Sequence, residues 1–441
     1  MKKIGMISLG CPKNQVDAEI LLAKLAENGY EITNDVDGVD AVIVNTCAFI
    51  EDAKKEAIEN ILDMVQLKEE GAVGKVIVSG CLAERYKEEI AKEIPEVDAV
   101  VGLGSNKDIL TVLDKVFSAD TIVESYGAKT DLPLCGERML TTPPYTAYIK
   151  IAEGCSNGCT YCIIPSIRGA FRSRPAEDIL EEAKQLAENG VKELIVVAQD
   201  TTRYGEDLYG KPALAALLTA LNKIEKLNWI RVLYSYPERL TDEMIDAFAD
   251  NEKVLPYFDI PIQHASADVL KRMHRVGDKQ MLLDLVQKIR TRIPEAVLRT
   301  TLITGFPGES EEDFETLCAF VKEAKFDRLG CFAYSPEEGT LAANMPDQIE
   351  DHVKVARGEH IMELQYRIFE EKNQEAVGKT FSTVVEGYDP YTDSYYGRTY
   401  RDAPEIDGQI YFTCGYPLEE GDFVEVEVFD VRDYDLLGEV V

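Results

Sequence analysis

The first part of the chain alternates short apolar runs with amphipathic stretches. Uninterrupted apolar runs, which predict buried strands, occupy residues 4–9, 40–45 and 75–79. Helical spacing follows the first two runs, over residues 17–27 and 51–66, and we expect a third helix after residue 79. Regular alternation of strand and helix predicts a parallel sheet that is covered by helices.

The middle of the chain continues the alternation with six more strand-like runs, at residues 146–151, 193–198, 230–234, 257–262, 297–303 and 328–334. Helical segments such as 176–189 and 242–250 separate these runs. Six strand-helix units do not complete an eight-stranded barrel, so the pattern predicts an open or partial barrel. Its active site would lie at the carboxyl ends of the strands.

The pattern changes again toward the end of the chain. A long polar helix is predicted over residues 349–376, and the sequence after Gly378 is rich in strands and turns. The predicted strands are residues 381–386, 395–400, 409–413 and 423–431. Short strands joined by turns of this kind predict a small antiparallel β domain.

The boundary between the first two regions is predicted near Arg138. Between residues 116 and 146 the periodicity is lost and prolines appear, which is typical of a linker. The predicted domains are therefore residues 1–138, 139–376 and 377–441, and the overall fold class is α/β. A chain of 441 residues with 45% hydrophobic positions has enough apolar side chains to form two or three cores.

Net charge narrows the choice of partner. The formal charge is -33, and residues 377–441 are the most densely acidic part, with 4 basic and 15 acidic side chains. This composition disfavours direct nucleic-acid binding and favours a basic partner. Because no apolar signal region and no apolar run of about 18 residues is present, we expect a cytoplasmic protein without a membrane partner.

Three cysteines occupy equivalent positions in the first region, since Cys11, Cys47 and Cys81 each follow a predicted strand. Loops at the carboxyl ends of parallel strands lie along one edge of the sheet, so these thiols could meet there. Spacing alone leaves two interpretations open. The cysteines are either metal ligands or small buried residues at strand ends.

A second group of three cysteines has the spacing CxxxCxxC. The sequence CSNGCTYC places Cys155, Cys159 and Cys162 directly after the first strand of the middle region. Thiolates at this spacing can converge on one soft-metal centre, and three ligands leave one coordination position open for a substrate or cofactor. Of the other cysteines, Cys135 has no partner at a recognisable spacing. Apolar surroundings predict core positions for Cys318, Cys331 and Cys414.

These features together resemble the radical S-adenosylmethionine enzymes. The CxxxCxxC loop after a first strand, Tyr161 before the third cysteine and six strand-helix units carry the resemblance. The three upstream cysteines and a terminal β domain of TRAM type extend it over the whole chain and indicate a methylthiotransferase.

Within that group the sequence resembles the ribosomal-protein aspartate methylthiotransferases (RimO type) rather than the tRNA adenosine methylthiotransferases (MiaB type), which are the alternative. The segments that carry this resemblance are SLGCPKNQVDAE, IKIAEGCSNGCTYCIIPSIRG, AQDTTRYG and PIQHASADVLKRMHR. The acidic charge of residues 377–441 agrees with it independently, because a TRAM domain that binds RNA should be basic.

The resemblance implies transfer of a methylthio group to the β-carbon of an aspartate in small-subunit ribosomal protein twelve. It implies two 4Fe-4S clusters as cofactors. One, on Cys155, Cys159 and Cys162, would reduce S-adenosylmethionine to give a 5'-deoxyadenosyl radical. The other, on the three upstream cysteines, would present sulfur to the substrate radical, and another S-adenosylmethionine would supply the methyl group. All six cysteines would therefore be both metal-binding and catalytic.

The resemblance also implies partners and cofactor contacts. An electron donor such as a flavodoxin or ferredoxin is expected, the sulfur donor is unknown, and the basic ribosomal protein is met free or on the small subunit. The candidate cofactor-binding residues are Tyr161, Gln199, Asp200, Ile303 and Gly305.

Each of these sites also has an ordinary structural interpretation. Tyr161 could be an aromatic residue packed in the core, and Asp200 could be a helix cap. The loop around Gly305 could be an ordinary turn. His264 is a further candidate for contact with substrate or cofactor, although most histidines in such places are structural. The basic run Arg168, Arg172 and Arg174 would bind a carboxylate of substrate or cofactor, or pair with local acids such as Glu177 and Asp178.

Overall fold

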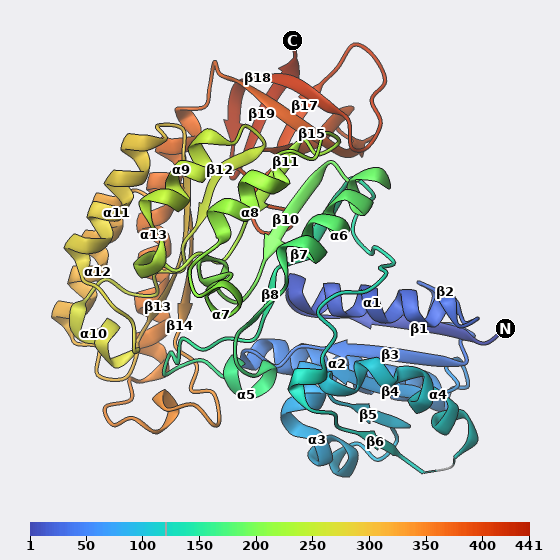
Figure 1. Ribbon diagram of the computed structural model, residues 1–441. Coiled ribbons are helices and arrows are strands. Elements are labelled where there is room, and N and C mark those ends of the chain that lie inside the picture. The colour runs from blue at the N-terminus through green and yellow to red at the C-terminus, as the bar shows by residue number, and fades with distance from the viewer. Residues whose placement is uncertain (120) are drawn as a thin grey trace.

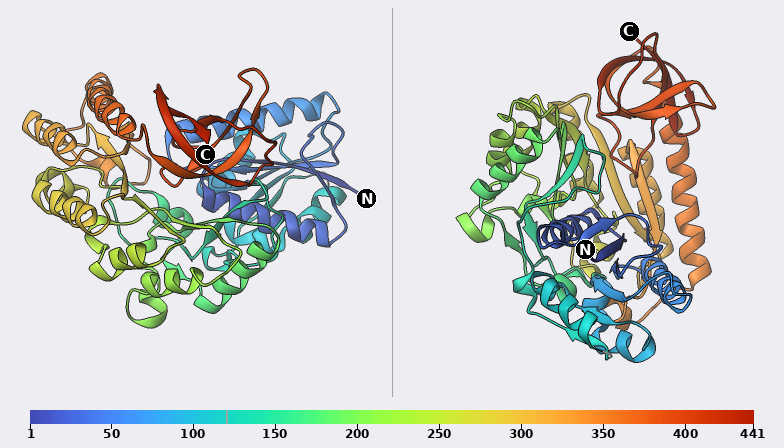
Figure 2. Two further views of the ribbon diagram at one scale, coloured as in Figure 1. Left: turned by 90° about the horizontal axis from the view of Figure 1, so that it is seen from above. Right: turned by 90° about the vertical axis from the view of Figure 1, so that its right-hand side faces the viewer.

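The computed structural model describes residues 1–119 and 121–441, which form two parallel sheets and a closed β barrel (Figure 1). The predicted α/β fold class is confirmed. An N-terminal parallel sheet precedes an open parallel sheet of six strands, and a small β barrel ends the chain. In the right-hand view of Figure 2 this barrel lies at one end of the molecule and the N-terminal sheet toward the other.

The N-terminal sheet has the strand order β2-β1-β3-β4-β5-β6, and all its pairings are parallel. Its strands are β1 (Lys3–Ser8), β2 (Glu31–Thr33), β3 (Ala41–Thr46), β4 (Val76–Gly80), β5 (Ala99–Val101) and β6 (Val123–Ser125). The helices between them are α1 (Pro12–Glu27), α2 (Glu51–Glu69), α3 (Cys81–Glu93) and α4 (Ile109–Ser118). Every residue of β3 is buried, as its continuous apolar run predicts.

The prediction of an irregular segment over residues 116–146 is wrong at its start. Helix α4 continues to Ser118, and β6 adds an edge strand to the N-terminal sheet. Residue 120, in the same stretch, lies outside the described residues. Strands β2, β5 and β6 have three residues each, which is too short for alternation along the sequence to reveal them.

The central sheet has the order β14-β13-β12-β11-β10-β7 and is parallel throughout, so the predicted open six-stranded arrangement is confirmed. Its strands are β7 (Thr146–Lys150), β10 (Glu193–Val197), β11 (Trp229–Val232), β12 (Val254–Asp259), β13 (Val297–Thr304) and β14 (Arg328–Ala333). The main helices are α6 (Ala176–Glu188), α8 (Leu214–Leu221), α9 (Asp242–Asp250), α11 (Lys279–Arg292), α12 (Glu311–Ala324) and α13 (Asp351–Gln374), with the short α7 (Glu206–Tyr209) and α10 (Ala267–Arg272) beside them.

The two faces of the central sheet are covered differently. One face packs on the helices around it in the largest hydrophobic core. On the inner face, Tyr148 and Tyr257 pack against Val16 of α1 and against Val384 and Ala403 of the C-terminal barrel. The inside of the open sheet is therefore filled by parts of both neighbouring domains rather than left as a channel.

The C-terminal barrel contains β15 (Thr380–Asp389), β16 (Ser394–Thr399), β17 (Ile410–Thr413), β18 (Phe423–Arg432) and β19 (Asp435–Val440). The antiparallel prediction is wrong for one pair, because β17 and β19 run parallel where the barrel closes. The last strand, β19, was not predicted. Among the described residues, no helix combines the length and apolar character needed to cross a membrane.

A buried carboxylate that pairs with two arginines connects this barrel to the amino ends of the central strands. Glu193, the first residue of β10, accepts hydrogen bonds from Arg231 at 2.9 Å and from Arg398 of the barrel at 2.7 Å. Beside this pair, the rings of Trp229 and Phe423 meet edge to face with centroids 4.8 Å apart. Both arginines lower the pKa of the Glu193 carboxyl, although burial opposes that shift. The barrel therefore lies at the end of the sheet opposite to the cysteine loop.

We predict that Arg398→Met lowers the free energy of unfolding by about 3 kcal/mol, because Glu193 loses one of two cations that compensate its burial. Chemical denaturation followed by circular dichroism measures this change. Arg292→Met is the matched control, since Arg292 pairs with Asp246 and Asp250 on the exposed surface. Equal effects of the two substitutions would contradict the prediction.

Candidate functional site

The CxxxCxxC loop leaves the carboxyl end of the first central strand, as predicted. It runs from the short strand β8 (Ala152–Glu153) to the short helix α5 (Ile164–Arg168). At its start Gly154 has a φ of +73°, and a Cβ there would lie 2.3 Å from the carbonyl oxygen of Ala170. The amide of Cys155 donates to the carbonyl of Gly169 at 3.1 Å. Only glycine permits this tight crossing of the two arms of the loop.

Neighbouring strand ends hold the loop in place. Asp200, which follows β10, accepts a hydrogen bond from Asn157 Nδ2 at 2.8 Å. The amide of Thr160 donates to the carbonyl of Met273 at 3.2 Å. Burial raises the pKa of the Asp200 carboxyl, and its hydrogen bonds with Thr202 and Asn157 oppose that shift. Asp200 was predicted to contact a cofactor, and in the structure its side chain anchors the cysteine loop.

The three thiols of the loop lie close enough to influence one another. Cys155 and Cys159 are buried and Cys162 is half-buried. Burial raises the pKa of the Cys162 thiol to about 12, and the charges of Cys159 and Cys155 add to this shift. The hydroxyl of Tyr236 lies 3.4 Å from Cys159 Sγ. The loop therefore presents three neighbouring sulfurs, one of which is partly open to solvent.

The upstream cysteines also lie at neighbouring strand ends. Cys11 precedes α1, Cys47 follows β3, and Cys81 begins α3. A Cβ at Gly10 would lie 2.9 Å from Cys47 Sγ, so the ends of β1 and β3 pack closely. The structure thus places the three residues along one edge of the sheet, as their equivalent positions in the sequence predicted.

The electrostatic environment of these three thiols is uneven. Burial raises the pKa of the Cys81 thiol to about 12; Arg168 opposes this shift, while Cys11 and Cys47 add to it. Burial alone would also raise the pKa of Cys11, but the charges of Lys13 and Arg168 outweigh it and lower that pKa. Two cations therefore stabilise negative charge at this site.

A buried network of four charges joins the two cysteine groups. Arg168 Nη1 lies 2.9 Å from Asp17 Oδ2 and 3.0 Å from Glu153 Oε2, and Lys150 Nζ lies 2.8 Å from Glu153 Oε2. Lys150 also pairs with Asp17. Asp17 belongs to α1 of the N-terminal domain, whereas Lys150, Glu153 and Arg168 flank the CxxxCxxC loop. The network fixes the two domains against each other.

Arg168 also reaches the second cysteine group directly. Its Nη2 donates to Cys81 Sγ at 3.5 Å. The local-acid interpretation of this basic run is therefore wrong for Arg168, whose partners Asp17 and Glu153 are not Glu177 or Asp178. Arg174 pairs with Glu182 at 2.6 Å, and Arg172 donates to the carbonyls of Thr130 and Lys129.

The candidate cofactor residues lie at the same carboxyl ends of the central strands. Tyr161 and Ile303 pack against one apolar cluster that contains Phe306, and the rings of Tyr161 and Phe306 meet edge to face with centroids 6.4 Å apart. Gln199 Nε2 donates to Glu153 Oε1 at 3.2 Å. The Gln199 Oε1 atom is buried and has no hydrogen-bond partner within the described chain, so it is available to a ligand.

Gly305 was predicted to contact the cofactor, and the structure shows a different requirement for glycine at this position. This glycine has a φ of +71°, and a Cβ would lie 2.1 Å from Lys354 Cγ of α13. Packing against Lys354, rather than close approach of a ligand, therefore requires glycine on that side. The amide of Gly305 donates to Glu309 Oε2 at 2.8 Å, which stabilises the turn.

His264 lies next to Glu309. Its side chain is fully buried, its Nδ1 accepts from the Ser266 amide at 3.0 Å, and its Nε2 lies 3.5 Å from Glu309 Oε2. Arg357 pairs with the other oxygen of the same carboxylate at 2.7 Å. Within the described residues His264 Nε2 has no hydrogen-bond partner, and contact of His264 with substrate or cofactor stays a prediction. Glu309 was missed because its role depends on a turn that the sequence alone does not show.

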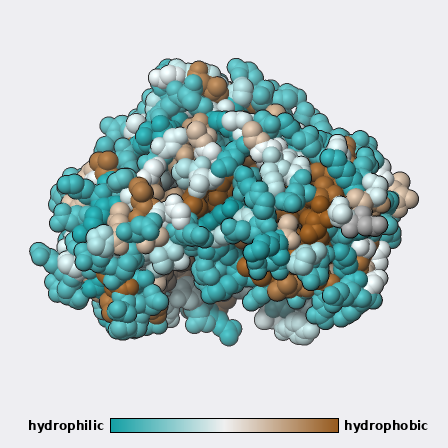
Figure 3. All heavy atoms as spheres, turned by 90° about the horizontal axis from the view of Figure 1, so that it is seen from below, coloured by the Kyte–Doolittle hydropathy of each residue, from teal (hydrophilic) through white to brown (hydrophobic). Residues whose placement is uncertain are grey.

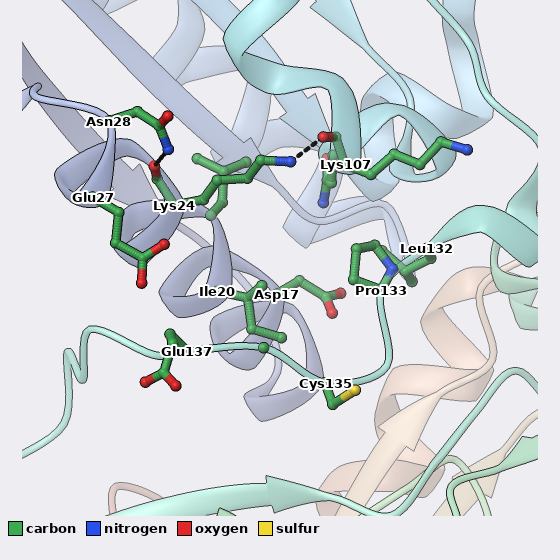
Figure 4. Close-up of a pocket in the computed structure, with 13 residues that line it drawn as sticks. Asp17, Ile20, Lys24, Glu27, Asn28, Lys107, Leu132, Pro133, Cys135 and Glu137 are labelled. Atoms are coloured by element: carbon green, nitrogen blue, oxygen red, sulfur yellow. Dashed lines mark hydrogen bonds between the residues drawn. The ribbon is translucent and has the colours of Figure 1, made fainter.

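One cavity is lined by none of the six cysteines of the two groups. It has a volume of about 330 Å³ and lies between α1 and residues 132–137, where Cys135 is exposed (Figure 4). Lys24 at its wall already donates to the carbonyl of Lys107. The molecular face in Figure 3 is mostly hydrophilic with small separate apolar patches. Neither feature carries reactive groups comparable with the two cysteine groups.

The donor chemistry of each cysteine group suits an iron-sulfur cluster. Among the residues described, no three His, Cys, Asp or Glu side chains are placed to hold a single metal ion. In a cubane cluster each thiolate binds a different iron, so its ligands stand farther apart than those around one ion. Three thiols per group also leave one iron without a protein ligand, and the nearby cations offset the negative charge that thiolates bring.

Comparison with known proteins gives a consistent result. Three family profiles match the chain: "Uncharacterized protein family UPF0004" over residues 3–102, "Radical SAM superfamily" over 149–321 and "TRAM domain" over 377–441. A protein of Caldanaerobacter subterraneus described as ribosomal protein uS12 methylthiotransferase RimO is 51% identical over 100% of both chains. A protein of Clostridioides difficile with the same description is 50% identical over 100% of this chain and 99% of its own.

Solved structures share the fold at low identity. A radical S-adenosylmethionine methyltransferase, TsrM, from Kitasatospora setae superposes with a TM-score of 0.56 at 12% identity, over 75% of this chain and 73% of its own. At this level of identity the likeness concerns the fold alone.

We predict that Gly154→Ala disorders the CxxxCxxC loop, because the added methyl group would overlap the carbonyl of Ala170. Gly158→Ala is a matched control in the same loop: its φ of +70° is equally unusual, but nothing lies within 4 Å of the added Cβ. Hydrogen-deuterium exchange should show lost protection over residues 155–173 in the first variant only. The control should cost only the strain of that backbone conformation, about 1 kcal/mol. Equal exchange in both variants would be inconsistent with the tight crossing.

Proposed function

The chain belongs to the ribosomal protein uS12 methylthiotransferase family, and from that premise we propose how its own residues perform the reaction. The family acts by radical S-adenosylmethionine chemistry, and the chain transfers a methylthio group to ribosomal protein uS12. The observation that carries the assignment of residues is the placement of two three-thiol groups at facing sheet edges, joined by the buried network of Asp17, Lys150, Glu153 and Arg168.

We assign Cys155, Cys159 and Cys162 as ligands of a 4Fe-4S cluster that binds S-adenosylmethionine at its open iron. When bound, the cluster and S-adenosylmethionine would together supply two things: one-electron reduction of the cofactor, and an organic radical that removes hydrogen from a carbon with no acidic proton. The half-buried Cys162 lies on the open side of the group. Tyr161 and Ile303 shield that side with apolar surface, and the unpartnered Oε1 of Gln199 is a suitable acceptor for an ammonium or hydroxyl group of the cofactor.

We assign Cys11, Cys47 and Cys81 to a second 4Fe-4S cluster that delivers sulfur. Arg168 supports this role in two ways. Its guanidinium donates to Cys81 Sγ, which favours the thiolate over the thiol, and its other contacts hold it beside the CxxxCxxC loop. Lys13 adds a second positive charge next to Cys11. The two groups can thus serve one substrate carbon without movement of the domains.

The proposed reaction site is the β-carbon of an aspartate in uS12. Full-length identity of about 50% to proteins described as uS12 methylthiotransferases favours this substrate over tRNA. The acidic barrel of residues 377–441 suits a basic ribosomal protein. Because that barrel contacts the amino ends of the central strands, a substrate held there must reach across the molecule to the cysteines. Whether uS12 is free or on the ribosome stays open.

Further components of the reaction stay predictions. A flavodoxin or ferredoxin would supply electrons, the sulfur donor is not identified, and a cytoplasmic location follows from the proposed ribosomal substrate. The predicted domains also keep their proposed roles, with residues 1–138 presenting sulfur, 139–376 generating the radical and 377–441 binding the substrate protein.

We predict that Cys155→Ala, Cys159→Ala and Cys162→Ala abolish 5'-deoxyadenosine formation, because each removes a ligand that no neighbouring side chain replaces. Cys11→Ala, Cys47→Ala and Cys81→Ala should still form 5'-deoxyadenosine but add no methylthio group to uS12. Anaerobic assays of reconstituted protein, with liquid chromatography for the nucleoside and mass spectrometry for uS12 and tRNA, measure both products.

Cys135→Ala is the control for these assays, since Cys135 is exposed and belongs to neither cysteine group. Full methylthiolation by a variant of Cys11, Cys47 or Cys81 would contradict the two-cluster assignment. A mass gain on tRNA alone would refute the proposed substrate.

A further inference from the structure

Lys13 carries a buried amino group without a carboxylate partner. It lies two residues after Cys11 in the first turn of α1, and its side chain is only 7% exposed. Its Nζ lies 3.5 Å from the carbonyl oxygen of Ala198 and 3.5 Å from the centre of the Tyr234 ring. Within the described residues, no carboxylate oxygen lies within 4.0 Å of Lys13 Nζ, the distance limit for an ion pair. An unpaired buried charge costs several kcal/mol.

The nearest acidic side chains are already committed to other cations. Glu153 pairs with Lys150 and Arg168. Asp259, at the end of β12, pairs with Arg299 at 2.8 Å and accepts from the amide of Tyr234 at 2.9 Å. Both carboxylates already balance other cations, and neither is an ion-pair partner of Lys13. A counter-charge for Lys13 can come from the neighbouring Cys11 group or from an anion that a ligand brings.

Lys13 lies beside one of the two cysteine groups and beside the ends of central strands. Cys11 lies on one side, and the ends of β10 and β11 lie on the other. Tyr234 has a φ of +63°, an unusual conformation for a large residue. Such strain costs about 1–3 kcal/mol and is kept where the surrounding structure enforces it. Here the bond to Asp259 enforces it and holds the ring over the ammonium. Tyr234 and Cys11 are both half-buried.

We propose that Lys13 binds the side-chain carboxylate of the target aspartate, with the ring of Tyr234 as the wall of the subsite. This inference rests on the proposed function, which supplies the aspartate. An ion pair at Lys13 would hold the adjacent β-carbon between the two cysteine groups. It would also select the substrate, because a neutral side chain leaves the ammonium buried and unpaired.

The competing explanation is that Lys13 serves only the cysteine group beside it, by offsetting the charge of Cys11. The two explanations differ in what they predict for binding. A substrate ion pair couples Lys13 to the target aspartate, whereas a purely local role changes iron content or reduction potential and leaves uS12 binding unaltered.

The test is a double-mutant cycle between the enzyme and uS12. Lys13→Met keeps an unbranched apolar chain and removes the charge. The binding constant of uS12 is measured by calorimetry with anaerobically reconstituted enzyme and no reductant, so that no turnover occurs. Each enzyme is tested with uS12 and with uS12 carrying asparagine in place of the target aspartate. Lys24→Met, on the same helix, is the control and should bind like the wild type.

We expect Lys13→Met to weaken binding of uS12 by about 30-fold, the lower end for loss of a buried charge partner. The asparagine substrate should weaken binding to the wild-type enzyme by a similar factor, with little further loss in Lys13→Met. Lys13→Arg should restore part of the affinity for the aspartate substrate. If Lys13→Met does not fold, the asparagine substrate with wild type and Lys13→Arg still tests the pair.

Four results would overturn the inference. Independent, additive losses in the cycle would mean that Lys13 does not contact the carboxylate. Unchanged affinity with lower iron content or a shifted reduction potential would assign Lys13 to the cysteine group. A wild-type enzyme that adds no methylthio group to uS12 would instead refute the proposed function, and the inference with it. Methylthiolation by wild type together with normal binding by Lys13→Met would refute the inference alone.

Discussion

The buried network of Asp17, Lys150, Glu153 and Arg168 is the constraint on which the rest of the structure depends. Each of these side chains is at most 1% exposed. Two cations and two carboxylates balance, and removing one would leave an uncompensated buried charge at a cost of about 3–5 kcal/mol. Such a network specifies one arrangement of the domains, since a displaced α1 would separate Asp17 from Lys150 and Arg168. The relative position of the two cysteine groups follows from it.

That arrangement separates two tasks along the molecule. The mouths of the N-terminal and central sheets face each other around Arg168, and the chemistry is concentrated there. The C-terminal barrel contacts the opposite end of the central strands through Glu193 and Arg398. Its acidic composition suits a basic protein substrate, and the proposed subsite at Lys13 and Tyr234 would then receive the reacting residue.

Much of the fold and the positions of all six cysteines at strand ends were predictable from the sequence. Long apolar runs such as β3 and regular strand-helix spacing are local signals, and the resemblance of CSNGCTYC to a known motif added the expected chemistry. Short strands such as β5 were not predictable, because three residues show no periodicity. The parallel closure of β17 on β19 was missed because it depends on long-range pairing.

The side chains around the cysteines were harder to predict because their roles depend on partners far away in the sequence. Arg168 pairs with Asp17, which is 151 positions away in the sequence. Acidic residues close to Arg168 in the sequence therefore did not predict this partner. Asp200 anchors Asn157, and Gly305 makes room for Lys354. The sequence did not reveal these contacts, and contact of either residue with a cofactor stays a prediction. No sequence pattern marks Lys13, since only the structure shows that its side chain is buried without a carboxylate partner.

The most direct test of this account is an anaerobic crystal structure of the reconstituted protein with S-adenosylmethionine, with anomalous difference density recorded at the iron edge. The account predicts two iron clusters, one bonded to Cys155, Cys159 and Cys162 and the other to Cys11, Cys47 and Cys81, facing each other beside Arg168. A single cluster, or two clusters on opposite sides of the molecule, would contradict it.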